Sequence, residues 1–563
     1  MSNIRSVIFT LLLTASTSFA QISVLKPAFG RDGMVSSADS IASAVGVEIM
    51  KEGGNAIDAA VAIGFVLAVT YPQAGNLGGG GYYMIHLSNG GNYAIDARET
   101  APSRAARDMY LDSVGNVDSH RELIGGLSVG VPGNVDGLIL AEKKFGRLSL
   151  AKVMQPAIEL AKNGFRVSYA LADVFKRDKG RLSLYRTTMR YFSKDGHMYE
   201  AGELLVQKDL AKVLEKIAEK GRDGFYEGKI PEMIAREDQE TGGIITAKDV
   251  EDYHAELKRP ISVDYRGYDV LSMPPSSSGG VCLAEELNIL SNFDLSKYGY
   301  GASESFHYEI EAMRRAFADR DKYLGDVDFV SVPLERLLSK SYADSLAKEI
   351  DPFSATPSIE IYPGLIHPPH EGTHTTHYSV IDGEGNAVSV TTTLNSYFGS
   401  FVVVSGAGFF LNNEMDDFSA KPGTPNQFGA IGGNANSIGP NKRMLSSMTP
   451  TIVLKGGNPF LILGSPGGTT IINAVLQVIL NVIDYHMPLA RAVEAGRIQM
   501  QWVPDIVYYE PDALVYDVKQ SLISRGYHLE PREYIGEVET ILVTPYGYEG
   551  VADPRGPGDA EGY

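Results

Sequence analysis

The strongest constraint on this chain is an abrupt change in its character just before residue 375. Residues 351–374 are rich in proline, which interrupts helices and is excluded from central β-strands. Two runs rich in β-branched residues follow directly, at 377–382 and 387–394, and the loop Gly383-Glu-Gly-Asn386 separates them. The pattern predicts an exposed, irregular connector that is open to cleavage, followed at once by a β-hairpin.

The hairpin brings several hydroxyl groups together at one end of its strands. A loop of this length pairs residue i with about residue 769 − i, to within one position. Thr375 and Thr376 then lie across from Leu394 and Thr393, and Asn395 lies beside them. The sequence therefore predicts a hydroxyl cluster directly after a cleavable connector.

A threonine in this position becomes a nucleophile if the chain is cut before it. The threonine hydroxyl is barely ionised near neutral pH, so it needs a base within hydrogen-bond reach. A free N-terminal amine on the same residue is such a base, because its pKa of about 7.7–8.0 suits proton transfer near neutrality. Cleavage between His374 and Thr375 would create that amine. The residues alone leave Thr375 and Thr376 as alternatives.

The rest of the chain predicts helices around short strands. Asn55 is a candidate N-cap for an almost wholly apolar helix at 56–69, which a glycine-rich stretch from Gly75 to Gly81 follows. At 563 residues the chain exceeds one ordinary core, so we expect two domains or one layered unit of two lobes, with a mostly helical first part. Further helices are expected at 149–163, 210–219, 303–322 and 469–483, and a second strand pair at 451–454 and 459–464.

The charge of the chain and its N-terminal residues limit its partners and its location. A net charge of −19 repels phosphate backbones and anionic lipid surfaces, so neither nucleic acid nor a membrane is expected as a partner. Arg5, an apolar run at 7–13 and Ser18-Phe-Ala20 predict a secretory signal peptide cleaved after Ala20, rather than a buried N-terminal helix. The apolar run is too short to span a bilayer.

The cysteine content excludes an internal disulfide. Cys282 is the only cysteine, so stability must come from burial. A catalytic thiol would need a base, and no histidine is close to it in the sequence. We interpret Cys282 as a buried structural thiol at the start of a helix.

The segment from Thr375 to Gly399 resembles the start of the small subunit of γ-glutamyltranspeptidases. It reads Thr-Thr-His-Tyr-Ser-Val-Ile-Asp-Gly-Glu-Gly-Asn-Ala-Val-Ser-Val-Thr-Thr-Thr-Leu-Asn-Ser-Tyr-Phe-Gly. The resemblance covers essentially the whole mature chain. It implies an N-terminal-nucleophile hydrolase fold of the α+β class, a four-layer αββα sandwich formed by a large subunit, 21–374, and a small subunit, 375–563. Further matching motifs are Gly75 to Gly81, Asp96-Ala-Arg-Glu-Thr-Ala-Pro102, Leu411-Asn-Asn-Glu-Met-Asp-Asp-Phe-Ser419, Pro440-Asn-Lys-Arg-Met-Leu-Ser-Ser-Met448 and Gly464-Ser-Pro-Gly-Gly468.

The resemblance also implies roles for individual residues. It chooses Thr375 over Thr376 as the residue that cleaves the precursor and then serves as the nucleophile, with Thr393 hydrogen-bonded to it. The backbone N–H groups of Gly467 and Gly468 are expected to form the oxyanion hole. The α-amino group of a γ-glutamyl substrate is expected at Asn395, Glu414 and Asp417, and its α-carboxylate at Arg98, Ser446 and Ser447.

The implied reaction is γ-glutamyl transfer through an ester on Thr375. Glutathione is the expected donor, glutamine and other γ-glutamyl compounds are further donors, and water, an amino acid or a peptide is the acceptor. No cofactor or metal is required, the two subunits form a heterodimer, and the periplasm or the medium is the expected location. Lys421 to Ile438 looks like the lid loop of some family members, with Phe428 where some bacterial relatives carry a tyrosine, so the reach of a phenolic hydroxyl is lost.

Other interpretations of the same residues are weaker. A cluster of histidines suggests a metal site, but prolines among them prevent the helix that would align their side chains. An acidic cluster suggests a calcium loop, but apolar residues interrupt its oxygen-ligand spacing. Gly78 to Gly81 lacks the Gly-Lys-Ser/Thr of a phosphate loop, so we expect close backbone packing there. The histidines are His367, His370, His374 and His377, and the acidic residues are Glu414, Asp416 and Asp417.

Two alternative functions remain. An acylase of the same fold would remove glutaryl or similar groups, which lack an α-amino group, and the residues expected to bind that amino group argue against it. A non-catalytic γ-glutamyl-peptide binding protein would keep the pocket without turnover, and the presence of Thr375, Thr393 and both oxyanion glycines argues against that.

Overall fold

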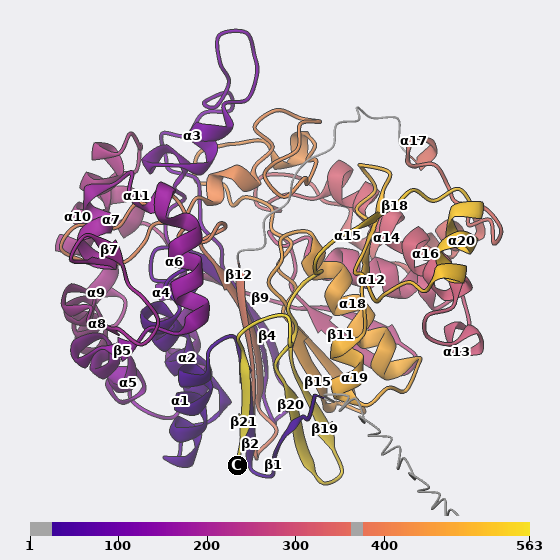
Figure 1. The fold of residues 1–563 in the computed structure, drawn as a ribbon, viewed down its shortest axis with the longest axis horizontal. Helices are drawn as coiled ribbons and strands as arrows, with labels where there is room; N and C mark the ends of the chain where they lie inside the picture. Colours follow the sequence, from indigo (N-terminus) through magenta and orange to yellow (C-terminus); the bar gives the residue numbers. More distant parts are fainter. Residues whose placement is uncertain (1–24, 362–374) are drawn as a thin grey trace, which may run out of the picture.

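Two β-sheets lie face to face at the centre of the molecule, with helices on both outer sides (Figure 1). The computed structural model describes residues 25–361 and 375–563. One group of helices covers the first sheet and another covers the second, which gives the expected four-layer αββα sandwich of the α+β class (Figure 1). The first group includes α1 (Ser40–Lys51), α2 (Ala56–Thr70), α4 (Asn134–Phe145), α5 (Leu150–Asn163) and α8 (Lys208–Lys220). The second includes α12 (Gly279–Leu290), α14 (Ser303–Tyr323), α16 (Lys340–Lys348), α18 (Thr470–Ile483), α19 (Leu489–Glu494) and α20 (Tyr516–Ser524).

Each sheet has seven strands, and every neighbouring pair within it is antiparallel. The sheet that contains the predicted hairpin, here called the hairpin sheet, has the order β21 (Asp559–Gly562), β2 (Gly33–Ser37), β12 (Thr375–Asp382), β13 (Ala387–Thr393), β3 (Gly80–His86), β4 (Asn92–Ala97) and β9 (Glu256–Lys258). The second sheet has the order β1 (Ala28–Gly30), β20 (Gly547–Val551), β19 (Glu539–Thr544), β15 (Asn458–Gly464), β14 (Thr451–Lys455), β11 (Tyr268–Ser272) and β10 (Ile261–Tyr265).

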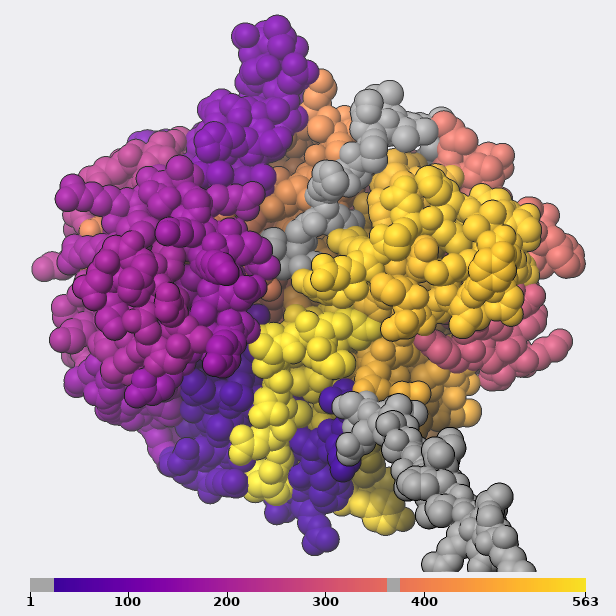
Figure 2. Space-filling model, viewed as in Figure 1, coloured from indigo at the N-terminus to yellow at the C-terminus, as the bar shows by residue number. Residues whose placement is uncertain are grey.

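Both sheets mix strands from the two ends of the chain. In the hairpin sheet, β2 pairs with β12 on one side and with β21 on the other. In the second sheet, β1 pairs with β20. Figure 2 shows the C-terminal segment lying against N-terminal residues on one face of the molecule. Residues before 361 and after 375 therefore build one structure and share its core.

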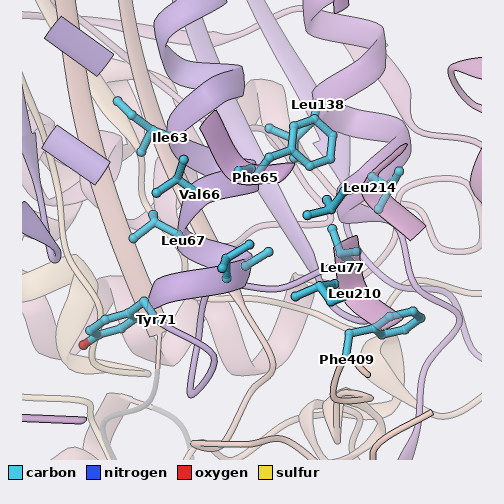
Figure 3. Close-up of a cluster of buried hydrophobic side chains, with 14 of the residues drawn as sticks. Ile63, Phe65, Val66, Leu67, Tyr71, Leu77, Leu138, Leu210, Leu214 and Phe409 are labelled. Atoms are coloured by element: carbon cyan, nitrogen blue, oxygen red, sulfur yellow. The ribbon is translucent and has the colours of Figure 1, made fainter. Parts of the chain in front are cut away.

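The apolar helix α2 is the centre of the core that covers the hairpin sheet. Every one of its residues is buried. Its start matches the sequence prediction, because the Asn55 side chain accepts hydrogen bonds from the N–H groups of Ile57 and Asp58. The Asp58 carboxylate accepts the Asn55 N–H in return, which completes a capping box. Its apolar side chains lie among those of neighbouring helices and loops, as Figure 3 shows for Phe65, Leu138, Leu210, Leu214 and Phe409.

The hairpin register lies within the one-position margin of the sequence expectation and is shifted by one residue from its central value. Thr375 pairs with Thr393, where the expectation placed Thr376 across from Thr393. The cause lies in the turn, because Asp382 belongs to it and does not pair across the hairpin. Its carboxylate accepts hydrogen bonds from the N–H groups of Glu384 and Asn386, so the last pair is formed one residue earlier.

The other predicted elements are present with small shifts of their ends, and some strands were missed. The predicted helices correspond to α2, α5, α8, α14 and α18, and the second strand pair corresponds to β14 and β15. The description of the first part as mostly helical is incomplete, because it also supplies β3, β4, β10 and β11. Strand β3 begins with Gly80-Gly81, which a sequence pattern reads as a loop. The described part of the connector, up to residue 361, is mostly exposed and includes the single turn α17 (Ser358–Ile361).

Polar side chains fill the space between the two sheets next to the hairpin. The His377 ring lies 2.8 Å from Thr391 Oγ1 through Nδ1 and 3.2 Å from Ser379 Oγ through Nε2. A Cβ at Gly464 of the facing sheet would lie 2.3 Å from this ring, so the glycine lets the sheets approach. Burial lowers the pKa of His377 to about 3, so the ring is neutral. The other three histidines of the proposed cluster lie outside the described residues.

Candidate active site

The predicted site residues meet at the end of the hairpin sheet, where β12 begins and β13 ends. Seven of the ten residues expected from the sequence line one pocket there. Four further residues of the same wall are Arg320 from α14, Asn426 and Phe428 from the lid loop, and Thr469 at the start of α18. The seven are Thr375, Thr393, Asn395, Asp417, Ser446, Ser447 and Gly468.

The two threonines are held side by side by the strand pairing. Thr375 Oγ1 lies 3.4 Å from Thr393 Oγ1, and both side chains are buried. Thr393 Oγ1 also accepts the N–H of Asn395 at 2.8 Å, which fixes the direction of its lone pairs. Thr375 shares its face of β12 with His377, between the sheets, because side chains alternate along a strand. Thr376 therefore lies on the opposite face, where no described group bonds to its Oγ1.

The glycine-rich stretch supports this corner through its backbone. A Cβ at Gly79 would lie 2.1 Å from the carbonyl oxygen of Thr393, so only glycine fits there. Asn76 donates to the same carbonyl at 2.9 Å and accepts the N–H of Gly79 at 2.8 Å. The expected close packing of the backbone is confirmed. Asn395 follows with φ of 73°, and its side chain donates to the Asn413 carbonyl at 3.0 Å.

Gly467 and Gly468 form the turn that enters α18. Their φ values of 134° and 57° belong to the region that glycine reaches without strain. Neither N–H has a hydrogen-bond acceptor among the residues that the structure describes. The helix dipole adds partial positive charge at this end of α18. The turn can therefore stabilise a negative oxygen, although only Gly468 lines the pocket itself.

Arg98 lies behind the pocket in a buried cluster of charges. It donates to the Glu414 carboxylate at 2.6 Å and forms a second ion pair with Asp417. The sequence analysis expected these three residues to contact the substrate, Arg98 at its carboxylate and the two acids at its amino group, but Arg98 and Glu414 do not line the pocket. Burial raises the pKa of Asp417, and the Arg98 guanidinium acts in the opposite direction. Burial also raises the pKa of the adjacent Glu99 to about 8, so its carboxyl group is mostly protonated at pH 7.

The side-chain oxygens of Ser446 and Ser447 each accept a hydrogen bond from the protein. Ser446 Oγ accepts the N–H of Met448 at 3.1 Å, and Ser447 Oγ accepts from Arg320 Nη2 at 3.3 Å. Among the described residues, neither hydroxyl proton has a hydrogen-bond acceptor. Each is therefore free to donate to a carboxylate in the pocket.

The lid loop is tied to the acidic end of the pocket. Asn426 donates to Asp417 Oδ1 at 3.0 Å, and its own oxygen accepts the N–H groups of Phe428 and Ala430, both at 3.0 Å. The Phe428 ring is buried against the oxyanion turn, because a Cβ at Gly468 would lie 2.7 Å from it. The lid therefore contacts both the acidic residues and the oxyanion turn.

The acidic residues proposed as a calcium loop, all of them described, are engaged with other groups. Glu414 and Asp417 bond to Arg98, whereas Asp416 lies 3.4 Å from the N–H of Gln427. The described residues contain no group of three or more side chains arranged to hold a metal ion. Cys282 is buried in α12, and burial raises the pKa of its thiol, as expected for a structural cysteine.

Comparison with known proteins identifies the family. The family model for gamma-glutamyltranspeptidase matches residues 42–563. The chain belongs to the γ-glutamyltranspeptidase family. It is 50% identical over 542 residues to the glutathione hydrolase proenzyme of Escherichia coli K12, covering 95% of this chain and 92% of that protein.

Solved structures of similar proteins agree with this family assignment. A cephalosporin acylase from Bacillus halodurans matches with a TM-score of 0.85 at 29% identity, covering 98% of this chain and 99% of that one. A chain of γ-glutamyltranspeptidase from Helicobacter pylori matches at 47% identity with a TM-score of 0.57, covering 60% of this chain and 96% of that one. Among the described residues, none of the helices has the length and apolar character needed to cross a membrane.

Sequence reasoning missed two polar residues of this family member's pocket. Arg320 lies in a helical segment where a charged side chain reads as part of a solvated face. Asn426 lies in a loop rich in glycine and asparagine, where it reads as a turn residue. Only the folded structure brings them beside Ser447 and Asp417.

Proposed function

We propose that this chain is a self-cleaving γ-glutamyl transferase and hydrolase with Thr375 as its nucleophile. The observation that carries the proposal is the pairing of Thr375 with Thr393 in one pocket with Asp417, Ser446 and Ser447. Membership of the γ-glutamyltranspeptidase family supports the same reaction. The glutathione hydrolase activity named for the E. coli relative makes glutathione the proposed donor.

Maturation begins with Thr375 attacking the chain itself. Its Oγ adds to the carbonyl carbon of His374, the C–N bond breaks, and the nitrogen of Thr375 takes up a proton to become a free amine. Water then hydrolyses the resulting ester, which leaves a carboxylate on His374. The proposed products are a large subunit, 21–374, and a small subunit, 375–563, held together by the shared sheets.

Turnover repeats the same chemistry on a substrate. The new α-amine takes the Thr375 hydroxyl proton while Oγ attacks the γ-carbonyl of the donor. Backbone N–H groups of Gly467 and Gly468 stabilise the oxyanion, and the departing amine takes a proton as the C–N bond breaks. Water releases glutamate from the ester, or an acceptor amine takes the γ-glutamyl group. Thr393 orients the nucleophile in both steps.

The donor's zwitterionic head explains the remaining polar residues. Asn395, Glu414 and Asp417 are proposed to receive the α-ammonium group. Arg98, Ser446 and Ser447 are proposed to receive the α-carboxylate. An acylase for glutaryl groups remains the second candidate, because a cephalosporin acylase shares the fold. The buried carboxylates favour the first function, since a glutaryl group lacks the ammonium group that Glu414 and Asp417 are proposed to receive.

The test compares the wild type with Thr375→Ala and with Thr376→Val as a matched control. Denaturing gels report self-cleavage, and turnover of a γ-glutamyl anilide reports activity. We expect two fragments and turnover in the wild type and in Thr376→Val, whose hydroxyl makes no described bond. Thr375→Ala should give one inert band. A wild type that stays uncut and inactive would instead favour the binding-protein alternative, and cleavage in Thr375→Ala would assign the cut to another residue or protease.

Residues 1–20 are proposed to be a secretory signal peptide, so that the mature protein acts in the periplasm or the medium. Mass spectrometry of the mature N-terminus tests this, and a chain that retains Met1 after expression in a bacterial host would contradict it.

A further inference from the structure

We propose that Arg320 positions Ser446 and Ser447 and gives the pocket its selectivity for donors with a free α-carboxylate. The inference rests on the proposed function and concerns a residue that the sequence analysis did not select. Arg320 belongs to α14, is 6% exposed, and lines the same pocket as Thr375 and Ser447.

Arg320 holds the serine segment through two hydrogen bonds. Its Nη2 donates to Ser447 Oγ at 3.3 Å, and its Nε donates to Ser278 Oγ at 3.0 Å. Ser278 in turn donates to the Ser446 carbonyl at 2.6 Å through Oγ and at 2.7 Å through its N–H. One guanidinium therefore fixes both the side chain of Ser447 and the backbone of Ser446.

The bond to Ser447 also determines which way that hydroxyl donates. Arginine has no acceptor atom, so Ser447 Oγ can only accept from Arg320. The O–H of Ser447 is then left for a second partner in the pocket. A carboxylate is the matching partner, because it accepts hydrogen bonds and its negative charge balances that of the buried guanidinium.

The charges around the pocket support this assignment. Arg98 already forms ion pairs with Glu414 and Asp417 and lies 3.5 Å from the Glu99 carboxyl group, so acidic neighbours offset its charge before any substrate arrives. Arg320, by contrast, forms no ion pair within 4.0 Å with a carboxylate of the described chain, and its Nη1 has no described acceptor. Asp417 and Asp321 attract it only at longer range.

A buried, unbalanced guanidinium is costly unless a ligand completes it. Burial lowers the pKa of Arg320, yet arginine keeps its proton in proteins, so the charge must be met by an anion. The α-carboxylate of the donor is an anion that the γ-glutamyl reaction brings to Ser446 and Ser447. Arg320 and the two hydroxyls thus form one carboxylate site.

The test measures discrimination between two donors. One is γ-glutamyl-4-nitroanilide, and the other is the same anilide with its α-carboxylate converted to a carboxamide. The variants are Arg320→Gln and Arg320→Lys, and the control is Lys322→Gln, which removes a charge from an exposed position of the same helix. Self-cleavage on denaturing gels and thermal unfolding check that each variant is folded.

We expect Arg320→Gln to raise KM for the carboxylate donor by about 10- to 150-fold, the loss of a charged hydrogen bond. Its kcat/KM for the carboxamide donor should change less than about twofold, and Lys322→Gln should match the wild type. Arg320→Lys should lower the wild-type preference at least about threefold, because an ammonium cannot bond Ser278 and Ser447 with the geometry of the guanidinium fork.

Two results would overturn the inference. An equal loss of kcat/KM for both donors would mean that Arg320 acts only on structure, and an unchanged preference in Arg320→Lys would mean that it does not select the carboxylate. If Arg320→Gln fails to self-cleave, Arg320→Lys alone decides. A wild type without turnover or self-cleavage would refute the proposed function, whereas an active wild type with unchanged variants would refute only the role of Arg320.

Discussion

Replacing Thr393 by valine removes one oxygen atom from the centre of the proposed mechanism. The variant keeps a branched side chain of similar volume in β13, so the change is confined to hydrogen bonding. Among the described residues, the lost atom bonds to the hydroxyl of Thr375 at 3.4 Å and to the N–H of Asn395 at 2.8 Å. These two partners give two separate effects.

The first effect is on rate. The Thr375 oxygen gains negative charge as it attacks, and a hydrogen bond to a charged group contributes about 1.5–3 kcal/mol. Its loss should therefore lower kcat about 10- to 150-fold and slow self-cleavage by a similar factor. The second effect is on stability, because the buried N–H of Asn395 is left without an acceptor, which costs about 1–3 kcal/mol.

The assay follows self-cleavage of freshly purified precursor and the kcat of the mature enzyme, with urea unfolding as the measure of stability. Thr393→Ser is the matched control, because it restores the oxygen and should return most of both effects. Wild-type cleavage and kcat in Thr393→Val would refute the reasoning, as would a serine variant as slow as the valine variant.

Three further predictions concern the lid, the oxyanion turn and the inter-sheet histidine. Gly468→Ala should lower kcat about 100-fold, because the new Cβ would lie 2.7 Å from the Phe428 ring and displace the backbone N–H donor of residue 468. Adding Phe428→Ala should restore part of the lost kcat. If it restores none, this clash is not the cause. Asn426→Ala removes the 3.0 Å hydrogen bond to Asp417. It should raise KM about 10-fold for a donor with an α-amino group and leave KM for a glutaryl anilide unchanged. Equal increases of KM for both donors would contradict this. The pKa of about 3 for His377 means that the unfolded chain binds the extra proton as pH falls below about 6.5. The contribution of His377 to stability should therefore fall by about 1.4 kcal/mol per pH unit between these values. His377→Gln should remove that contribution from the pH dependence of urea unfolding, and parallel curves for the two proteins would show that folding does not lower the pKa of His377.

Much of the architecture could be predicted because local signals agree with the fold. The apolar run at 56–69 and its Asn55 cap specify α2, and the two β-branched runs after the connector specify β12 and β13. The register could be predicted only to within one position, because Asp382 bonds to the turn through side-chain contacts that a pattern of residue types does not reveal.

The candidate site could be predicted only where a residue stands in a recognisable motif. Most motif residues come together in one pocket, whereas Arg98 and Glu414 pair behind it. Arg320 and Asn426 were missed because their contacts span 127 residues and 9 residues respectively, and no local pattern reports which side of a helix or loop will face the pocket. Strand β3 was missed because it begins with Gly80 and Gly81, and glycine has a low strand propensity. These glycines allow the backbone of β3 to pack closely against β13.

The interleaved sheets have a consequence for the protein after it is cut. Each proposed subunit supplies strands between strands of the other, so pulling them apart would break several β-ladders and open both cores at once. The two subunits could then not separate without unfolding. The activity of the mature enzyme should be independent of dilution down to nanomolar concentration. The two fragments expressed separately should not assemble an active site when they are later mixed.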